Sequence, residues 1–270
     1  MLSNYSRWLV YLNAFLYAIL GFPLYILSEQ LAPVFAWKVT PFMTMTIGGW
    51  CLGNAWLAFI TARRWHWNQV HTALVYLWSF GISELIVLIL FRDKIKLEHP
   101  IAWLYLITLA VNALTALIGI TDWFKIRPSA EFSGGEVMKP IHRVFAATFV
   151  VFVGFLAIYG ISVQIGAVGT NGGIFPEIMS LFTLRGFGVF YLSIAIAALP
   201  YIWGKSLVTI LHHAFASYAL IVIITFAAFV NLRLFDFAKH PGGLLYFAAY
   251  LIVGIPLLFT FRKFGTGSVP

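Results

Sequence analysis

Charge is scarce in this sequence. Asp, Glu, Lys and Arg together make up only 10% of the 270 residues, whereas a soluble domain carries about 25%. Apolar residues account for 61% and aromatic residues for 18%. This composition excludes an ordinary water-soluble domain and predicts a membrane protein with aromatic belts at the bilayer interfaces.

Cysteine is almost absent, and so are the short motifs of catalysis. The single cysteine, Cys51, excludes an internal disulfide and any site with several cysteine ligands, and its apolar surroundings predict a packing residue. The chain has no GxxxxGK[ST], GxGxxG, HExxH or GxSxG sequence. We therefore expect no catalytic residue, no metal site and no required cofactor, which argues against an enzyme.

The net charge of +8 does not indicate nucleic-acid binding. The basic residues occur singly or in pairs in short loops between apolar runs, a distribution that follows membrane topology and contact with anionic lipid headgroups. The predicted partners are membrane lipids and, for a subunit of a complex, other membrane proteins. The oligomeric state stays open.

Eight apolar segments are long enough to cross the hydrocarbon core. They cover residues 7–28, 42–61, 70–91, 101–120, 143–166, 182–202, 206–232 and 243–261. The predicted fold class is all-α, with eight transmembrane helices. An even number of spans puts both termini on one side, where ten basic residues stand against seven on the other. The positive-inside rule makes this the cytoplasmic side.

The sequence contains an internal repeat. Residues 71–105 align without a gap on residues 212–246, with 8 identities in 35 pairs. The informative matches are His71 with His212, Arg92 with Arg233, and His99-Pro100 with His240-Pro241. We expect two four-helix units, residues 1–120 and 143–270, joined by a cytoplasmic linker, residues 121–142. Because each unit has an even number of helices, the repeats are predicted to be parallel.

A doubled passage precedes the second helix of each unit. The copies are "FAWKVTPFMTMTIGGW" (35–50) and "FPEIMSLFTLRGFGVF" (175–190). They resemble F-A-W-x-x-x-P-x-x-T and T-P-L-T-x-R-x-x-G-x-W-like passages of uncharacterised bacterial multi-pass membrane proteins with tandem four-helix units. Met45 stands where the arginine would fall in the first copy, and the second copy lacks the F-A-W. The resemblance implies this fold in a bacterial cytoplasmic membrane, and no activity.

Intramembrane polar residues are the candidate binding groups. Glu84 is the one carboxylate deep in a predicted span, and Arg185 lies at a compatible depth in another. Their depths are compatible with a structural ion pair between the repeats or with a substrate site, and the alternative is a neutral, hydrogen-bonded Glu84. Asn13, Asn54 and Asn112 lie near mid-bilayer, where they either join helices by hydrogen bonds or line a polar cavity with Glu84.

Two histidines at equivalent positions of the repeats are candidate ligands of one haem, or each of a chlorophyll-type pigment. His71 and His212 each begin a predicted span, and imidazole is a usual axial ligand of haem. The absence of C-x-x-C-H excludes c-type haem. The alternative is that both are interfacial residues, whose amphipathic rings suit that depth.

Three functions remain open at this point. The first is a non-catalytic membrane subunit or scaffold that packs against partner proteins and lipid or pigment. The second is a transporter or binder of a small, weakly polar or lipid-like solute in a cavity near Glu84, Arg185, Asn54 and Asn112. The third is a haem-dependent membrane oxidoreductase that uses His71 and His212. Composition favours the first, because loops are short and intramembrane charges are few.

Overall fold

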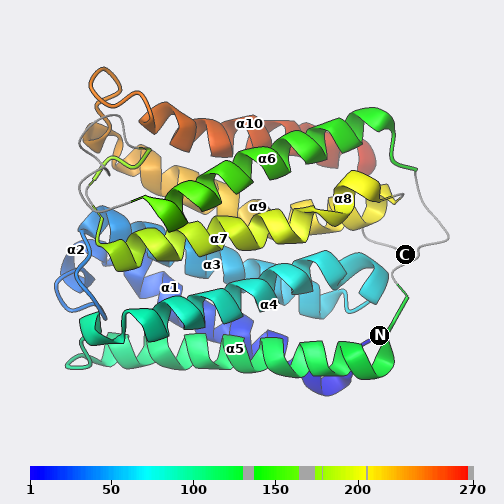
Figure 1. Ribbon diagram of the computed structural model, residues 1–270, viewed down its shortest axis with the longest axis horizontal. Helices are drawn as coiled ribbons and strands as arrows, with labels where there is room; N and C mark the ends of the chain where they lie inside the picture. The colour runs from blue at the N-terminus through cyan, green and yellow to red at the C-terminus, as the bar shows by residue number, and fades with distance from the viewer. Residues whose placement is uncertain (130–136, 164–173, 178, 205, 267–270) are drawn as a thin grey trace.

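Helices form most of the part of the chain that the structure describes. The computed structural model describes residues 1–129, 137–163, 174–177, 179–204 and 206–266 (Figure 1). Its elements are α1 (Asn4–Ile26), α2 (Ser28–Leu31), α3 (Pro41–Arg63), α4 (Trp67–Leu90), η1 (Arg92–Lys94), α5 (Pro100–Ile126), α6 (Pro140–Ser162), α7 (Leu181–Ala198), α8 (Pro200–Trp203), α9 (Leu207–Val230), η2 (Leu232–Leu234) and α10 (Gly243–Phe264). The predicted all-α class is confirmed.

Seven helices in the described part of the chain are long and apolar enough to span a membrane, which makes this a multi-pass membrane protein. They are α1, α4, α5, α6, α7 together with α8, α9 and α10. The predicted span 42–61 is also a helix, α3, with 23 residues, but it is less apolar. Eighteen of its residues are buried in the bundle. A helix surrounded by protein can carry threonines and glycines that a lipid-facing helix would replace with larger apolar residues.

Local sequence signals explain where the helices start. Proline occupies the first turn of α3, α5 and α6, where its missing N–H group costs no hydrogen bond. Thr40 and Ser180 cap α3 and α7, because each side-chain oxygen accepts a 3.2 Å bond from the backbone N–H three residues later. Pro200 cannot continue α7, and the chain turns there into α8.

The linker predicted at residues 121–142 is shorter in the structure. Its first six residues extend α5 to Ile126, and α6 already begins at Pro140. The predicted boundary was placed before Asp122 and Lys125 because they are charged. A helix end that leaves the membrane tolerates such charges. Residues 130–136 of the linker lie outside the described residues.

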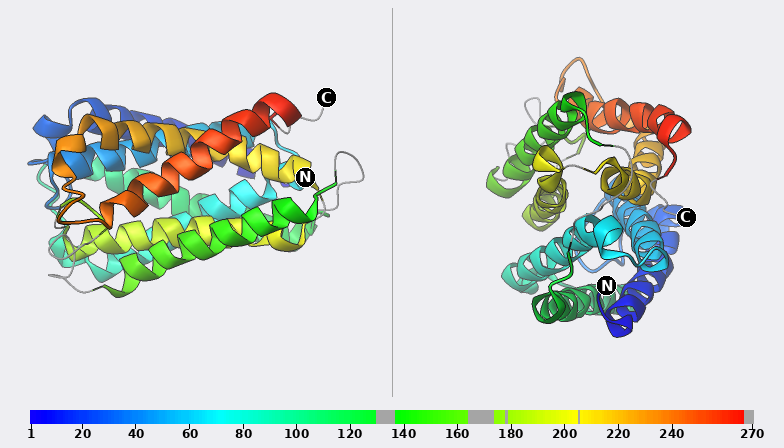
Figure 2. Two further views of the ribbon diagram at one scale, coloured as in Figure 1. Left: turned by 90° about the horizontal axis from the view of Figure 1, so that it is seen from above. Right: turned by 90° about the vertical axis from the view of Figure 1, so that its right-hand side faces the viewer.

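The long helices run along one axis and pack in two groups that meet through four helices. In the first group α1 contacts α3 and α5, and α4 contacts α5; in the second, α6 contacts α7 and α9 contacts α10. Between the groups, α3 packs on α9, and α4 packs on α7 and α9. Figure 2 shows the two groups end-on, one above the other. The chain's first helix starts, and its last helix ends, at the same end of the bundle (Figure 1).

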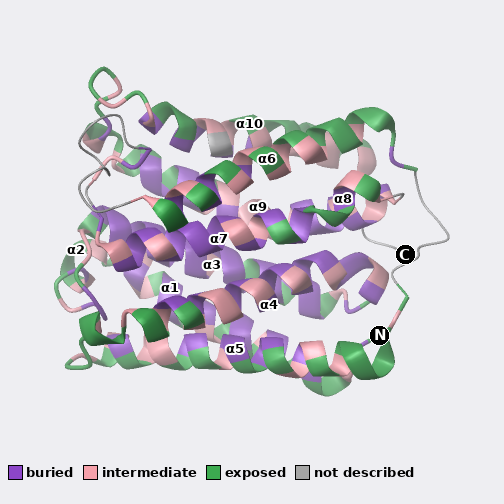
Figure 3. Cartoon of the chain, viewed as in Figure 1, coloured by how far each residue is buried: buried purple, intermediate pink, exposed green. Residues whose placement is uncertain are grey.

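Burial divides the bundle into an inner and an outer layer. Figure 3 shows α3 and α7 mostly buried, while the outward sides of α5, α6 and α10 are exposed. Large apolar side chains cover these outward sides, among them Trp103, Leu117, Phe145, Phe155, Ile252 and Phe259. An exposed surface this apolar suits contact with lipid tails and not with water.

Candidate functional site

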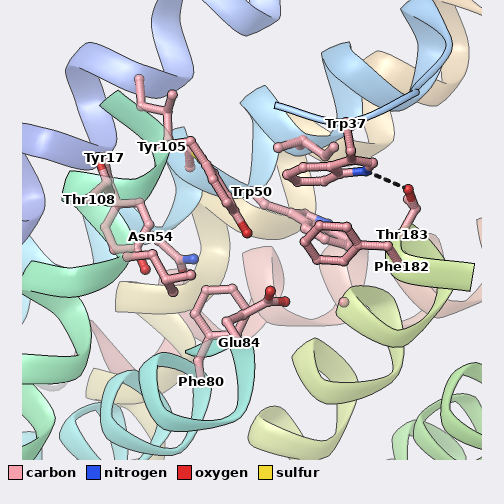
Figure 4. A pocket seen from close by; sticks show the side chains of 15 residues that line it. Tyr17, Trp37, Trp50, Asn54, Phe80, Glu84, Tyr105, Thr108, Phe182 and Thr183 are labelled. Atoms are coloured by element: carbon pink, nitrogen blue, oxygen red, sulfur yellow. Dashed lines mark hydrogen bonds between the residues drawn. The ribbon is translucent and has the colours of Figure 1, made fainter. Parts of the chain in front are cut away.

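A cavity of about 50 Å³ lies among α1, α3, α4 and α5, with α7 along one side (Figure 4). Its lining residues are Tyr17, Leu20, Trp37, Ile47, Trp50, Cys51, Asn54, Phe80, Glu84, Tyr105, Thr108, Leu109, Phe182, Thr183 and Gly186. A volume of this size holds about three or four water molecules. The cavity therefore belongs mainly to the first helix group, with the second group supplying a wall.

Glu84 is the charged residue of this cavity. Its side chain is only 7% exposed, and its carboxyl group points into the cavity (Figure 4). Within the described residues the ion pairs are Lys94–Asp93 and Lys239–Asp236, and Glu84 has no hydrogen-bond partner there. A carboxylate in such a position requires a proton or a cation, because burying an unpaired charge is very costly.

The backbone of α7 leaves room for this carboxyl group at Gly186. A Cβ atom on Gly186 would lie 3.3 Å from Oε1 of Glu84. That distance is tight for a carbon atom, so the glycine lets α7 approach α4 without pushing Glu84 aside. The site thus depends on contact between the two helix groups.

Trp37 separates the cavity from a wider outer pocket. It lines both the inner cavity and a pocket of about 290 Å³ that also includes Glu29, Lys38 and Lys96. Its indole N–H donates a 2.9 Å hydrogen bond to Thr183 Oγ1 on α7 (Figure 4). Its ring packs on Phe182 at 4.4 Å and on Tyr105 at 5.0 Å between centroids. Trp37 therefore lies between the outer pocket and the cavity.

A second bond ties the same two chain segments together. Thr40 donates to the carboxylate of Glu177, beside the N-terminus of α3. Trp37–Thr183 and Thr40–Glu177 both join the segment before α3 to the segment around the start of α7. Closure of the cavity at this end thus rests on polar contacts between the helix groups.

The asparagines predicted near mid-bilayer divide into two roles. Asn13 donates to Asn112 (3.2 Å), and Asn112 donates to the Tyr17 hydroxyl (2.7 Å). These two hydrogen bonds join α1 to α5. Asn112 does not line the cavity. Asn54 does line the cavity; its carbonyl oxygen accepts a 2.8 Å bond from Tyr76, and its buried Nδ2 has no partner.

Arg185 does not meet Glu84. Its guanidinium donates to the carbonyl oxygens of Gly160 (2.8 Å) and Val163 (3.0 Å) at the end of α6. A basic group beside the last carbonyls of a helix stabilises that helix end. The predicted Glu84–Arg185 pair is absent, and Arg185 has a structural role in α6–α7 packing.

His71 and His212 lie on α4 and α9, toward the end of the bundle opposite the Trp37 pocket. His71 Nδ1 is 3.0 Å from the Trp67 carbonyl oxygen. His212 is fully buried, and Nη1 of Arg64 is 3.3 Å from its Nδ1. Because arginine can only donate, Nδ1 accepts, and the proton of the neutral ring is on Nε2. His212 thus has no free lone pair for iron in this arrangement.

Sequence reasoning identified Glu84 and Asn54 but missed most of the cavity wall. Trp37 and Gly186 lie in the doubled passage, and that repetition was the one sequence feature that pointed to them. Cys51, expected to be a packing residue, lines the cavity as well. Tyr17 and Tyr105 carried no signal, because aromatic residues are common throughout this chain.

Comparison with protein families, curated proteins and solved structures finds no match for this chain.

Proposed function

We propose that this protein is a membrane transporter or binder of a small solute that reaches Glu84 from the outer pocket past Trp37. The observation that carries the proposal is the carboxyl group of Glu84, which is buried in a cavity without a hydrogen-bond or ion-pair partner among the described residues. A buried unpaired acid is destabilising by itself. A proton or a cationic ligand on the carboxyl group offsets this cost, and the cavity beside the group has room for such a ligand.

The arrangement of helices supports a two-fold relation between parallel repeats, an architecture found in many transporters. In the repeat, α3 corresponds to α7 and α4 corresponds to α9. A two-fold relation therefore pairs the α3–α9 contact with the α7–α4 contact, and the structure has both. Trp50 and Phe190, at matching places in the doubled passage, stack on each other at 4.6 Å with an angle of 11°. We infer an eight-helix protein in which α3 and α7 are equivalent central helices.

The two repeats differ in sequence at the cavity. Thr225 stands in α9 where α4 has Glu84, and its buried hydroxyl oxygen has no partner. One unit therefore carries the acid and the other supplies part of the wall. With both termini on the cytoplasmic side of a bacterial membrane, the outer pocket and Trp37 face away from the cytoplasm, and solute enters from there.

Trp37→Ala is expected to open the cavity to reagents. The substitution removes one hydrogen bond and three ring contacts, together about 2 kcal/mol, so Cys51 should react about tenfold or more faster with 2-hydroxyethyl methanethiosulfonate. This neutral reagent transfers its hydroxyethylthio group to the cysteine sulfur and releases methanesulfinate. Since Cys51 is the single cysteine, mass spectrometry of the purified protein in mild detergent follows the reaction without further labelling.

Trp103→Ala is the matched control. Trp103 is an exposed tryptophan on α5 whose indole donates to the Leu97 carbonyl oxygen and does not line the cavity. Its removal should leave the Cys51 rate unchanged. A Cys51 that stays unmodified in both the unaltered protein and Trp37→Ala would show that the cavity is sealed, and the proposed function would fail.

A further inference from the structure

We propose that the solute is a compact organic cation, whose ammonium group binds the Glu84 carboxylate between aromatic rings of the cavity. This rests on the proposed function and adds the chemical class of the solute. Three features of the cavity wall carry it: its charge, its aromatic content and its size.

The charge of the wall selects for a cation. Glu84 is the one charged side chain among the fifteen lining residues, and no Lys, Arg or His is present. Arg185, which could have neutralised it, is held by carbonyl oxygens of α6. An anion would therefore meet a negative group with nothing to compensate it, while a cation removes the cost of the unpaired carboxylate.

The aromatic content favours an ammonium group over a metal ion. Six of the fifteen lining residues are aromatic: Tyr17, Trp37, Trp50, Phe80, Tyr105 and Phe182. Hard metal cations take six or more oxygen ligands, and no group of three metal-ligating side chains occurs among the described residues. Ammonium groups are stabilised by aromatic rings together with a carboxylate.

The size of the cavity limits the solute to a small head group. The cavity has a volume of about 50 Å³, which is the space of a few water molecules. Asn54 keeps a free amide N–H group on this wall, which suits an oxygen atom on the solute or a bound water. A longer tail would have to extend past Trp37 into the outer pocket.

The charge preference is measurable at Cys51 with three reagents of matched length. These are the 2-aminoethyl, 2-hydroxyethyl and 2-sulfonatoethyl methanethiosulfonates, which are cationic, neutral and anionic. The rate at which each reagent modifies Cys51 is divided by its rate with a free thiol in water, which removes differences in intrinsic reactivity. In the unaltered protein we expect the cationic reagent to react about tenfold faster than the neutral one, and the anionic reagent slower.

Variants at Glu84 assign the preference to this carboxyl group. Glu84→Gln should bring the cationic-to-neutral ratio to about one, and Glu84→Asp should keep most of it. Glu29→Gln is the matched control, since Glu29 lines only the outer pocket, and it should leave the ratio unchanged. If Glu84→Gln does not fold, the cationic-to-neutral ratios of the unaltered protein and of Glu84→Asp still test whether the site prefers a cation.

The outcomes separate this inference from the function on which it rests. If the neutral reagent reaches Cys51 but the cationic-to-neutral ratio is one, the solute is not a cation, although the solute site stands. The same conclusion follows if the ratio stays high in Glu84→Gln. A ratio lost in Glu29→Gln moves the selectivity to the outer pocket and also overturns the inference. A Cys51 that no reagent reaches refutes both.

Discussion

Replacing Gly160 by Ala is expected to destabilise the protein by about 3 kcal/mol. Gly160 of α6 faces Gly188 of α7, and a Cβ atom on Gly160 would lie 2.5 Å from the Gly188 Cα and 2.6 Å from its backbone nitrogen. Backbone atoms cannot move aside as the end of a side chain can, so the two helices must separate. Small residues at such crossings allow the close packing that holds membrane helices together.

Gly154→Ala on the same helix is the control for this prediction. A Cβ atom there meets nothing within 4 Å, and the variant should unfold at nearly the same SDS mole fraction as the unaltered protein in mixed micelles. Equal unfolding midpoints for the Gly160 and Gly154 variants would contradict the α6–α7 packing described above.

The second large effect is expected at the contact between the helix groups. Gly53 of α3 faces Leu220 of α9, and a Cβ atom on Gly53 would lie 2.6 Å from the Leu220 Cγ and 2.7 Å from its Cα. Gly53→Ala should therefore cost about 2–3 kcal/mol. Because α3 also carries Trp50, Cys51 and Asn54 of the cavity, the same variant should speed the modification of Cys51.

Gly49→Ala tests the same interface one turn earlier without the clash. A Cβ atom on Gly49 would lie 3.4 Å from side-chain atoms of Ile223 and Tyr25, which is ordinary van der Waals contact. Unfolding of this variant should match that of the unaltered protein. If the two glycine variants on α3 lost equal stability, the close approach of α3 to α9 at Gly53 would be wrong.

The helices themselves were predictable from the sequence, because apolar runs and proline or hydroxyl caps mark them directly. Helix α3 was the informative exception: its threonines and glycines lower its apolarity below that of the other long helices. Sequence alone does not tell whether such a helix lies inside a bundle. The burial of Thr44, Thr46 and Asn54 supplies the reason for its composition.

The contacts of Glu84 were less predictable, because depth along a helix does not fix the direction in which a side chain points. Glu84 and Arg185 have compatible depths, but neighbouring residues of a helix differ by about 100° in direction. Gly186 faces Glu84, so Arg185, one residue earlier, turns toward α6. Which face of α7 meets α4 depends on how α7 also packs on α6, and no local pattern encodes it.

The position of Trp37 was hidden for a similar reason. The doubled passage drew attention to this segment, yet nothing in it names Thr183 as the acceptor of the indole N–H. That partner lies 146 residues further along the chain. A contact of this kind depends on how the two helix groups meet, which the repeat suggests only in outline.

The central claim is that a small cation occupies the cavity beside Glu84, and protection of Cys51 tests it most directly. The unaltered protein is treated with 2-hydroxyethyl methanethiosulfonate in rising methylammonium chloride, with sodium chloride at equal ionic strength as the control. We predict that methylammonium slows the modification of Cys51 in a saturable way and that sodium does not. Equal rates in the two salts at every concentration would contradict the account.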